Sequence, residues 1–111
     1  MDKSKATIQA AHDAIEHFGF IRSGPQWVES KFNFIVRSAD RYTKEYCESD
    51  HILRILVERI GDPFSVIIHL SKAASLEPPH QQEGITQDKR REISERIAAA
   101  MLYLKTPFEL Q

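Results

Sequence analysis

The chain has only one cysteine, Cys47, among its 111 residues, and it has no clear excess of charge of either sign. Its 15 Lys and Arg side chains face 16 Asp and Glu side chains, which leaves a net charge of −1. A lone cysteine argues against the disulfide scaffold of small secreted domains. The balanced charge argues against a nucleic-acid-binding domain, which normally carries a basic excess.

Long apolar runs are also missing from the sequence. No apolar segment approaches the roughly 20 residues that span a bilayer, and no apolar stretch follows Met1 as in a signal peptide. The 41% hydrophobic and 28% charged residues are typical of a globular domain. We therefore expect one soluble, cytoplasmic domain over residues 1–111, with neither a membrane nor a nucleic acid as its partner.

Apolar residues at helical spacing predict one helix at each end of the chain. The first helix has Asp2 or Ser4 as its N-cap and Gly19 at its C-terminal end. The second begins after Thr86 and ends at Pro107, and a loop over residues 72–85 precedes it. The predicted buried stripes are Ile8, Ala11, Ile15 and Phe18 in the first helix, and Ile93, Ile97, Ala100, Met101 and Leu104 in the second.

Between the helices the apolar period changes toward two, which is typical of strands. Residues 31–37 alternate, and residues 41–47 read as a second, wetter strand. Residues 51–60 fit either a strand or a helix, and we favour a hairpin that turns at residues 61–63 and continues over residues 64–70. The predicted fold is α+β: an N-terminal helix, an antiparallel four-stranded β-meander and a C-terminal helix packed on the sheet.

The hairpin register decides which side chains share a face of the sheet. If Ile60 pairs with Phe64, Leu56 lies opposite Ile68, and apolar side chains point to both faces. Two helices do not suffice to cover both faces. A partly open apolar face is therefore a candidate interface.

Three histidine or cysteine arrangements could carry chemistry, but a structural role explains each of them better. His12 and His17 are five residues apart, which places their rings ~140° apart around a helix at ~100° per residue. His51 and His69 lie ~13 Å apart in the register above, at ~3.3 Å per residue, too far to share one scissile bond. Cys47 has no activating base nearby in the sequence. We predict no catalytic residue, no metal ligand, no cofactor and no enzymatic activity.

Tyrosines and charged residues concentrate over residues 41–50, a composition that favours protein recognition. Acidic side chains in this segment and in the following loop can pair with basic groups of a partner. The predicted contact residues are Tyr42, Glu45, Tyr46, Glu48, Asp50, Glu77 and Glu83.

Four segments together resemble the small bacterial immunity proteins carried beside polymorphic toxins, including those of contact-dependent growth inhibition. These segments are residues 32–37, 41–46, 52–59 and 61–66. The resemblance implies a cytoplasmic protein that forms a heterodimer with one toxin domain and blocks its active site or substrate access. Many such toxins are nucleases, although several of their inhibitors are far more acidic than this chain.

Two alternatives remain open at this stage. A secretion-type chaperone or adaptor would hold a client on the open apolar face. A small nuclease-like enzyme would use His51, His69 or Asp62.

Overall fold

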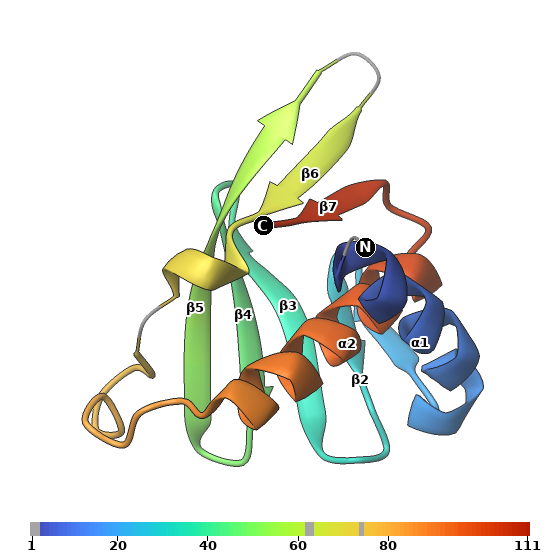
Figure 1. Ribbon diagram of the computed structural model, residues 1–111. Coiled ribbons are helices and arrows are strands. Elements are labelled where there is room, and N and C mark those ends of the chain that lie inside the picture. Colours follow the sequence, from blue (N-terminus) through green and yellow to red (C-terminus); the bar gives the residue numbers. More distant parts are fainter. Residues whose placement is uncertain (1–2, 62–63, 74) are drawn as a thin grey trace.

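The computed structural model describes residues 3–61, 64–73 and 75–111, which form two helices and one curled sheet (Figure 1). The helices are α1, Lys3–Phe18, and α2, Gln87–Tyr103, and a short 3₁₀ turn, η1, covers Leu70–Lys72. The strands are β1 Ile21–Gly24, β2 Trp27–Glu29, β3 Phe34–Asp40, β4 Thr43–Glu48, β5 His51–Ile60, β6 Ser65–Ile68 and β7 Phe108–Leu110. The α+β class is confirmed.

The sheet follows the chain in strict order from β1 to β7. Neighbouring strands are antiparallel up to β6, and β7 then adds in parallel to β6. The prediction of a four-stranded, purely antiparallel meander is therefore wrong in detail. The strands it missed have only four, three and three residues, too few to show an alternating pattern.

Both helices lie on the same face of the sheet (Figure 1). The strands bury Val28, Phe34, Val36, Leu53 and Ile55 in the core. The predicted stripe of α2 is confirmed, because Ile93, Ile97, Ala100, Met101 and Leu104 are all buried. Burial of large aliphatic side chains in this layer supplies the main stabilising contribution to the fold.

The helix ends show which local signals act. Gly19 has the left-handed φ of 58° expected after a helix, and its N–H donates to the Glu16 carbonyl at 3.1 Å. The Thr86 side chain accepts a hydrogen bond from the Lys89 N–H, as an N-cap does. Of the two proposed α1 caps, Asp2 lies outside the described residues, and Ser4 falls inside a helix that begins one residue earlier.

The α2 helix ends before Pro107, so that predicted boundary is wrong. Leu104 is the C-cap of α2, and Lys105 takes a left-handed φ of 55°. This reversal turns the chain back toward the sheet, where β7 pairs with β6. The chain has thus left the helix before the proline ring can interrupt it.

Residues 51–60 form a strand, as favoured, but the predicted hairpin register is wrong by one residue. Ile60 pairs with Ser65, and Val57 pairs with Ile68. A slip of one residue moves every side chain of a strand to the other face. The observed register places Val57, Val66 and Ile68 together in the core. Phe64 stays in the turn, half-exposed, and Leu56 and Ile60 are partly exposed on the other face of the hairpin.

The β4 strand is central and most of its side chains are buried, so the expectation of a wetter strand here is wrong. It pairs with β3 on one side and β5 on the other. Its residues Lys44, Glu45, Tyr46 and Cys47 are all buried. Polar residues can occupy such a strand only when their charges and hydrogen-bonding groups find partners within the fold.

Neither of the described helices is long and apolar enough to cross a membrane.

Candidate functional site

Two histidines and two carboxylates meet where the β4–β5 turn approaches the loop before α2 (Figure 1). We call Asp50, His51, His80 and Glu83 the histidine–carboxylate cluster. The rings of His51 and His80 stack with their centroids 3.7 Å apart and their planes at 19°. His51 Nδ1 lies 3.0 Å from Asp50 Oδ1, and His51 Nε2 lies 3.0 Å from Glu83 Oε1.

His80 completes the same cycle from the loop side. Its Nδ1 atom contacts Glu83 Oε2, and its Nε2 atom lies 3.1 Å from Asp50 Oδ2. The Nε2 atom is buried, and among the described residues it has no hydrogen bond of acceptable geometry. Asp50 therefore contacts both imidazoles along one edge of the stack, and Glu83 contacts both along the other edge.

The cluster shifts the acid–base behaviour of three of its members. The contact with Glu83 is the main cause of the raised pKa of His80. The His80 imidazole lowers the pKa of Asp50, and His51 followed by His80 lowers the pKa of Glu83. Each shift favours the charged form of its group, as expected for opposite charges in contact.

A cavity of about 240 Å³ adjoins the cluster. The cavity shares His51 and Glu83 with the cluster. Its lining residues are Tyr46, Glu48, His51, Leu76, Glu83, Gly84, Ile85, Lys89 and Ile93.

The polar floor of this cavity is an internal charge network centred on Glu48. Lys89 Nζ donates to both carboxylate oxygens of Glu48, at 2.8 and 2.9 Å. Arg96 donates to Tyr46 Oη at 2.8 Å and to Glu48 Oε1 at 3.1 Å. Burial by itself raises the pKa of Glu48, but hydrogen bonds from Lys89 and Tyr46 outweigh it, so the pKa is lowered. Burial raises the pKa of Tyr46, and the Glu48 carboxylate adds to this rise.

A row of paired side chains crosses the face of the sheet opposite the two helices. We call Trp27, Arg37, Glu45, Arg54 and Glu77 the cross-strand ladder, because the first four are direct neighbours on β2, β3, β4 and β5. The Arg37 guanidinium lies over the Trp27 ring, 5.1 Å from its centroid. Glu45 accepts from Arg37 Nε at 2.8 Å and from Arg54 Nε at 2.9 Å. Glu77 lies 3.6 Å from Arg54 and extends the row into the loop.

Glu45 is the fixed centre of the ladder. Only 5% of this residue is exposed, whereas the Arg54 side chain is 58% exposed. Burial by itself raises the pKa of Glu45, but Arg54 and Arg37 lower it further than burial raises it. The ladder thus holds two arginines and a tryptophan in place with one buried carboxylate.

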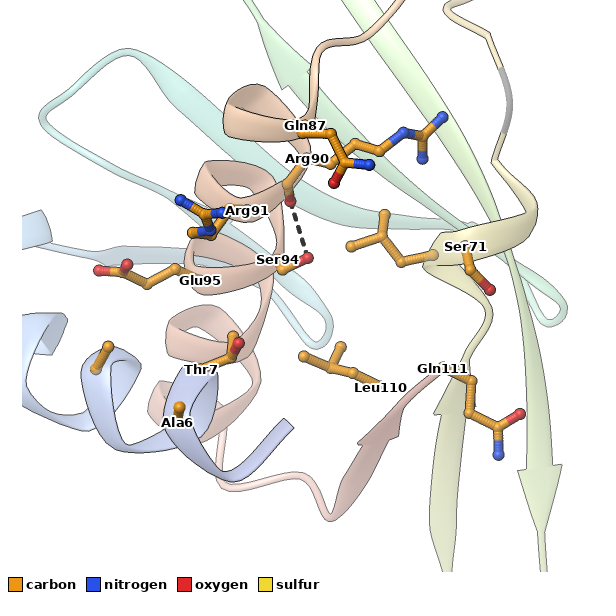
Figure 2. Close-up of a pocket in the computed structure, with 12 residues that line it drawn as sticks. Ala6, Thr7, Ser71, Gln87, Arg90, Arg91, Ser94, Glu95, Leu110 and Gln111 are labelled. Carbon is orange, nitrogen blue, oxygen red and sulfur yellow. Dashed lines mark hydrogen bonds between the residues drawn. The ribbon is translucent and has the colours of Figure 1, made fainter. Parts of the chain in front are cut away.

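A larger open hollow of about 620 Å³ lies between α1, the first half of α2 and the C-terminal residues (Figure 2). Two of its polar side chains are engaged within the fold: Arg90 donates to the Ala73 carbonyl at 2.8 Å, and Ser94 donates to the Arg90 carbonyl at 2.8 Å. Figure 2 shows Arg91 and Glu95 on one wall and Leu110 on the other. Arg91 also pairs with Asp88.

Six of the seven predicted contact residues divide among the histidine–carboxylate cluster, the cavity floor and the cross-strand ladder, and Tyr42 belongs to none of them. Asp50 and Glu83 belong to the histidine–carboxylate cluster, Tyr46 and Glu48 to the cavity floor, and Glu45 and Glu77 to the ladder. Every predicted acid therefore already has a positively charged or histidine partner within the chain.

The exposure assumed for the two predicted contact tyrosines holds for only one of them. Tyr46 is buried, whereas Tyr42 is 59% exposed at the β3–β4 turn. Tyr42 and Asp50 stand at opposite ends of β4, roughly 25 Å apart at ~3.3 Å per residue. The seven predicted residues do not form one continuous surface.

Sequence reasoning missed His80, and it also missed Trp27, Arg37 and Arg54 of the ladder. His80 lies in the predicted loop over residues 72–85, three residues before Glu83. His51 pairs with His80 rather than with His69, whose ring lies 2.5 Å from Glu58. The backbone N–H of His69 donates to the carbonyl of Leu56. Leu56 lies five residues along β5 from His51, which is roughly 17 Å at ~3.3 Å per residue, so His69 is far from His51. Asp62 lies outside the described residues.

No family model, no curated protein and no solved structure matches this chain.

Proposed function

We propose that this chain is a cytoplasmic, immunity-type protein that binds and neutralises a cognate toxin domain. We place the contact on the face of the sheet opposite the helices, at the cross-strand ladder. The partner is a folded protein domain, and the complex is a heterodimer that blocks the toxin's active site or its access to substrate. The resemblance of the strand segments to immunity proteins motivates the class of partner.

The observation that carries the proposal is the ordered row of Trp27, Arg37 and Arg54 on this face. Tryptophan and arginine are the residue types most enriched among side chains that dominate binding energy. Glu45 holds both guanidinium groups before a partner arrives, so less side-chain entropy is lost on binding. Leu56 is half-exposed on the same face and offers apolar area beside the ladder.

The internal pairing of the acids changes the expected chemistry of the contact. Asp50, Glu48 and Glu45 already neutralise positive or histidine groups of the same chain. The contact is therefore a mixed aromatic and polar one rather than an acidic imitation of a nucleic acid. Such a surface suits a partner whose own contact region is close to neutral.

The test uses the toxin domain encoded at the 3′ end of a long exported-protein gene directly upstream. Coexpression should protect cells from this domain, and purified proteins should form a one-to-one complex. Trp27→Ala and Arg54→Glu should each weaken binding about thirtyfold, which corresponds to about 2 kcal/mol at an interface hot spot. The matched control is Arg91→Glu, an exposed arginine on α2, which should leave binding unchanged.

Two results would contradict the proposal. The first is an upstream region without such a toxin domain, or a toxin domain that the chain neither binds nor neutralises. The second is equal loss of affinity in Arg91→Glu and Arg54→Glu, which would move the contact to the helix side.

The chaperone or adaptor alternative draws support from a different feature. The far end of the β5–β6 hairpin projects beyond the rest of the sheet (Figure 1). Ile60 and Phe64 lie near this end and are 44% and 45% exposed, and Tyr42 lies beside β5. An unfolded client segment could cover this apolar end. Preferential binding of unfolded segments over the folded toxin domain would favour this alternative.

A further inference from the structure

The histidine–carboxylate cluster holds together only if its ring nitrogens carry extra protons or if a cation binds there. Four ring nitrogens of His51 and His80 face four carboxylate oxygens of Asp50 and Glu83. A neutral imidazole carries one N–H and one lone pair, so two neutral rings supply protons for only two of the four contacts. The other two contacts then bring a nitrogen lone pair against a carboxylate oxygen, which is repulsive.

A bound cation removes this repulsion. The two ionised carboxylates bring a charge of −2, which a divalent ion balances. Neutral imidazole nitrogen and carboxylate oxygen are together a ligand set that Zn²⁺ and related transition-metal ions prefer. Hard ions such as Mg²⁺ and Ca²⁺ prefer oxygen ligands alone.

We propose that Asp50, His51 and His80 bind a divalent transition-metal ion of the Zn²⁺ class. The ligand atoms of these three residues all lie within 4.8 Å of one another. The two nitrogen–oxygen separations on the Asp50 side are 3.0 and 3.1 Å. Two ligand atoms ~2.1 Å from one tetrahedral ion lie ~3.4 Å apart, so small shifts suffice for these pairs.

The rings must also open from their stacked arrangement. Rings whose planes differ by 19° direct their lone pairs nearly parallel, whereas one ion needs the lone pairs to converge. The movement falls on His80, because the described residues of its loop form no helix or strand between η1 and α2. Glu83 then accepts from the outer nitrogens of the imidazoles and orients them, as carboxylates commonly do beside metal-bound histidines.

Metal binding would tie the loop before α2 to the β4–β5 turn. The cavity of about 240 Å³ shares His51 and Glu83 with this site. An ion bound at the cluster would therefore fix one wall of the cavity. This inference does not depend on the proposed toxin partner.

The experiment uses the full chain after dialysis against a chelator, with Zn²⁺ competed against a chromophoric chelator. We expect one equivalent to bind, and Co²⁺ to give visible absorption bands of a tetrahedral site. His80→Ala and Asp50→Asn should each weaken binding at least about tenfold, and Glu83→Gln about ten- to one-hundredfold. His12→Ala, which removes an exposed histidine of α1, is the matched control.

Circular dichroism of each variant, without metal, shows whether the fold persists. The proposal is overturned if the folded chain binds Zn²⁺ no better than Mg²⁺, or if His80→Ala retains full affinity. A cluster held by protons alone would give that first result. Equal loss in His12→Ala would place the ion elsewhere and overturn the proposal as well.

Discussion

Lys44 provides the sharpest test of how this fold handles a buried charge. The residue is only 3% exposed, and it lies on the helix-facing side of β4, in line with Ser38 and Ile55. Its Nζ atom donates to Gln26 Oε1 at 3.0 Å and to Ser38 Oγ at 3.1 Å. Both partners are neutral, so the ammonium charge is only partly compensated.

Burial, followed by the nearby positive charge of Arg59, lowers the pKa of Lys44 from 10.5 to about 8. Below pH ~8 both folded and unfolded chains carry the proton, and folding bears the full cost of the buried charge. Between pH ~8 and ~10.5 only the unfolded chain keeps it, so the free energy of unfolding rises with pH. At about 1.36 kcal/mol per pKa unit, the total gain is about 3 kcal/mol.

The assay is equilibrium unfolding in urea at intervals from about pH 7 to about pH 10. Lys44→Met removes the titrating group and keeps an unbranched side chain of similar length. The free energy of unfolding of the natural chain, minus that of Lys44→Met, should rise with pH across this window. The raised pKa of Tyr46 lowers stability above its ordinary pKa of 10, but this effect is common to both proteins and cancels in the difference.

Lys72→Met is the matched control, because Lys72 is exposed in η1. The difference between this variant and the natural chain should stay level across the same pH range. A level difference for Lys44→Met, or one that falls with pH, would refute the reasoning about the buried ammonium group.

Two further predictions concern a buried carboxylate and a helix cap. Glu45→Gln should lower the free energy of unfolding by about 1–3 kcal/mol at neutral pH, because Arg37 and Arg54 lose a charged acceptor. The pKa of Glu45 is lowered, so its stabilising contribution is present above its ordinary pKa of 4.5 and is lost as the pH falls through the folded value. Urea titrations at neutral and acid pH should therefore show the effect of Glu45→Gln shrinking, and a loss independent of pH would contradict this account. Thr86→Ala should cost about 1 kcal/mol in a thermal melt, and Thr86→Ser, which keeps the hydroxyl that accepts from the Lys89 N–H, should cost much less.

The helices could be predicted from the sequence because their signals are local. The stripe of α2 and its Thr86 cap depend on residues within a few turns of one another. Gly19 is also a local signal, because a glycine directly after a helical apolar pattern commonly ends the helix with a left-handed φ. Such features need no knowledge of the rest of the fold.

The sheet was less predictable because its pairing is not local. The apolar pattern of β5 and β6 is compatible with two registers that differ by one residue. Only the position of the helices selects the register that buries Val57 with Ile68. β7 was invisible for the same reason, since three residues become a strand only because the chain returns beside β6.

The sites were harder still, because each joins segments far apart in the chain. His51 and His80 are separated by 28 intervening residues, and only the folded loop stacks their rings. The sequence did indicate that residues 41–50 are rich in tyrosine and charge. It could not show that the side chains of this strand are buried, and so Glu45 and Tyr46 were assigned to a surface from which the fold removes them.

The acids of this near-neutral chain pair with its own basic side chains. Glu45 holds two arginines on the open face, and Glu48 holds Lys89 and Arg96 on the helix side. Acids that neutralise internal cations are not free to imitate the phosphates of a nucleic acid. In the proposed complex, recognition of the partner depends on the groups that these acids position, which are the exposed Arg54 and the Arg37–Trp27 pair. For this reason, reversing the charge of Arg54 tests the proposed interface more directly than reversing any of the acids.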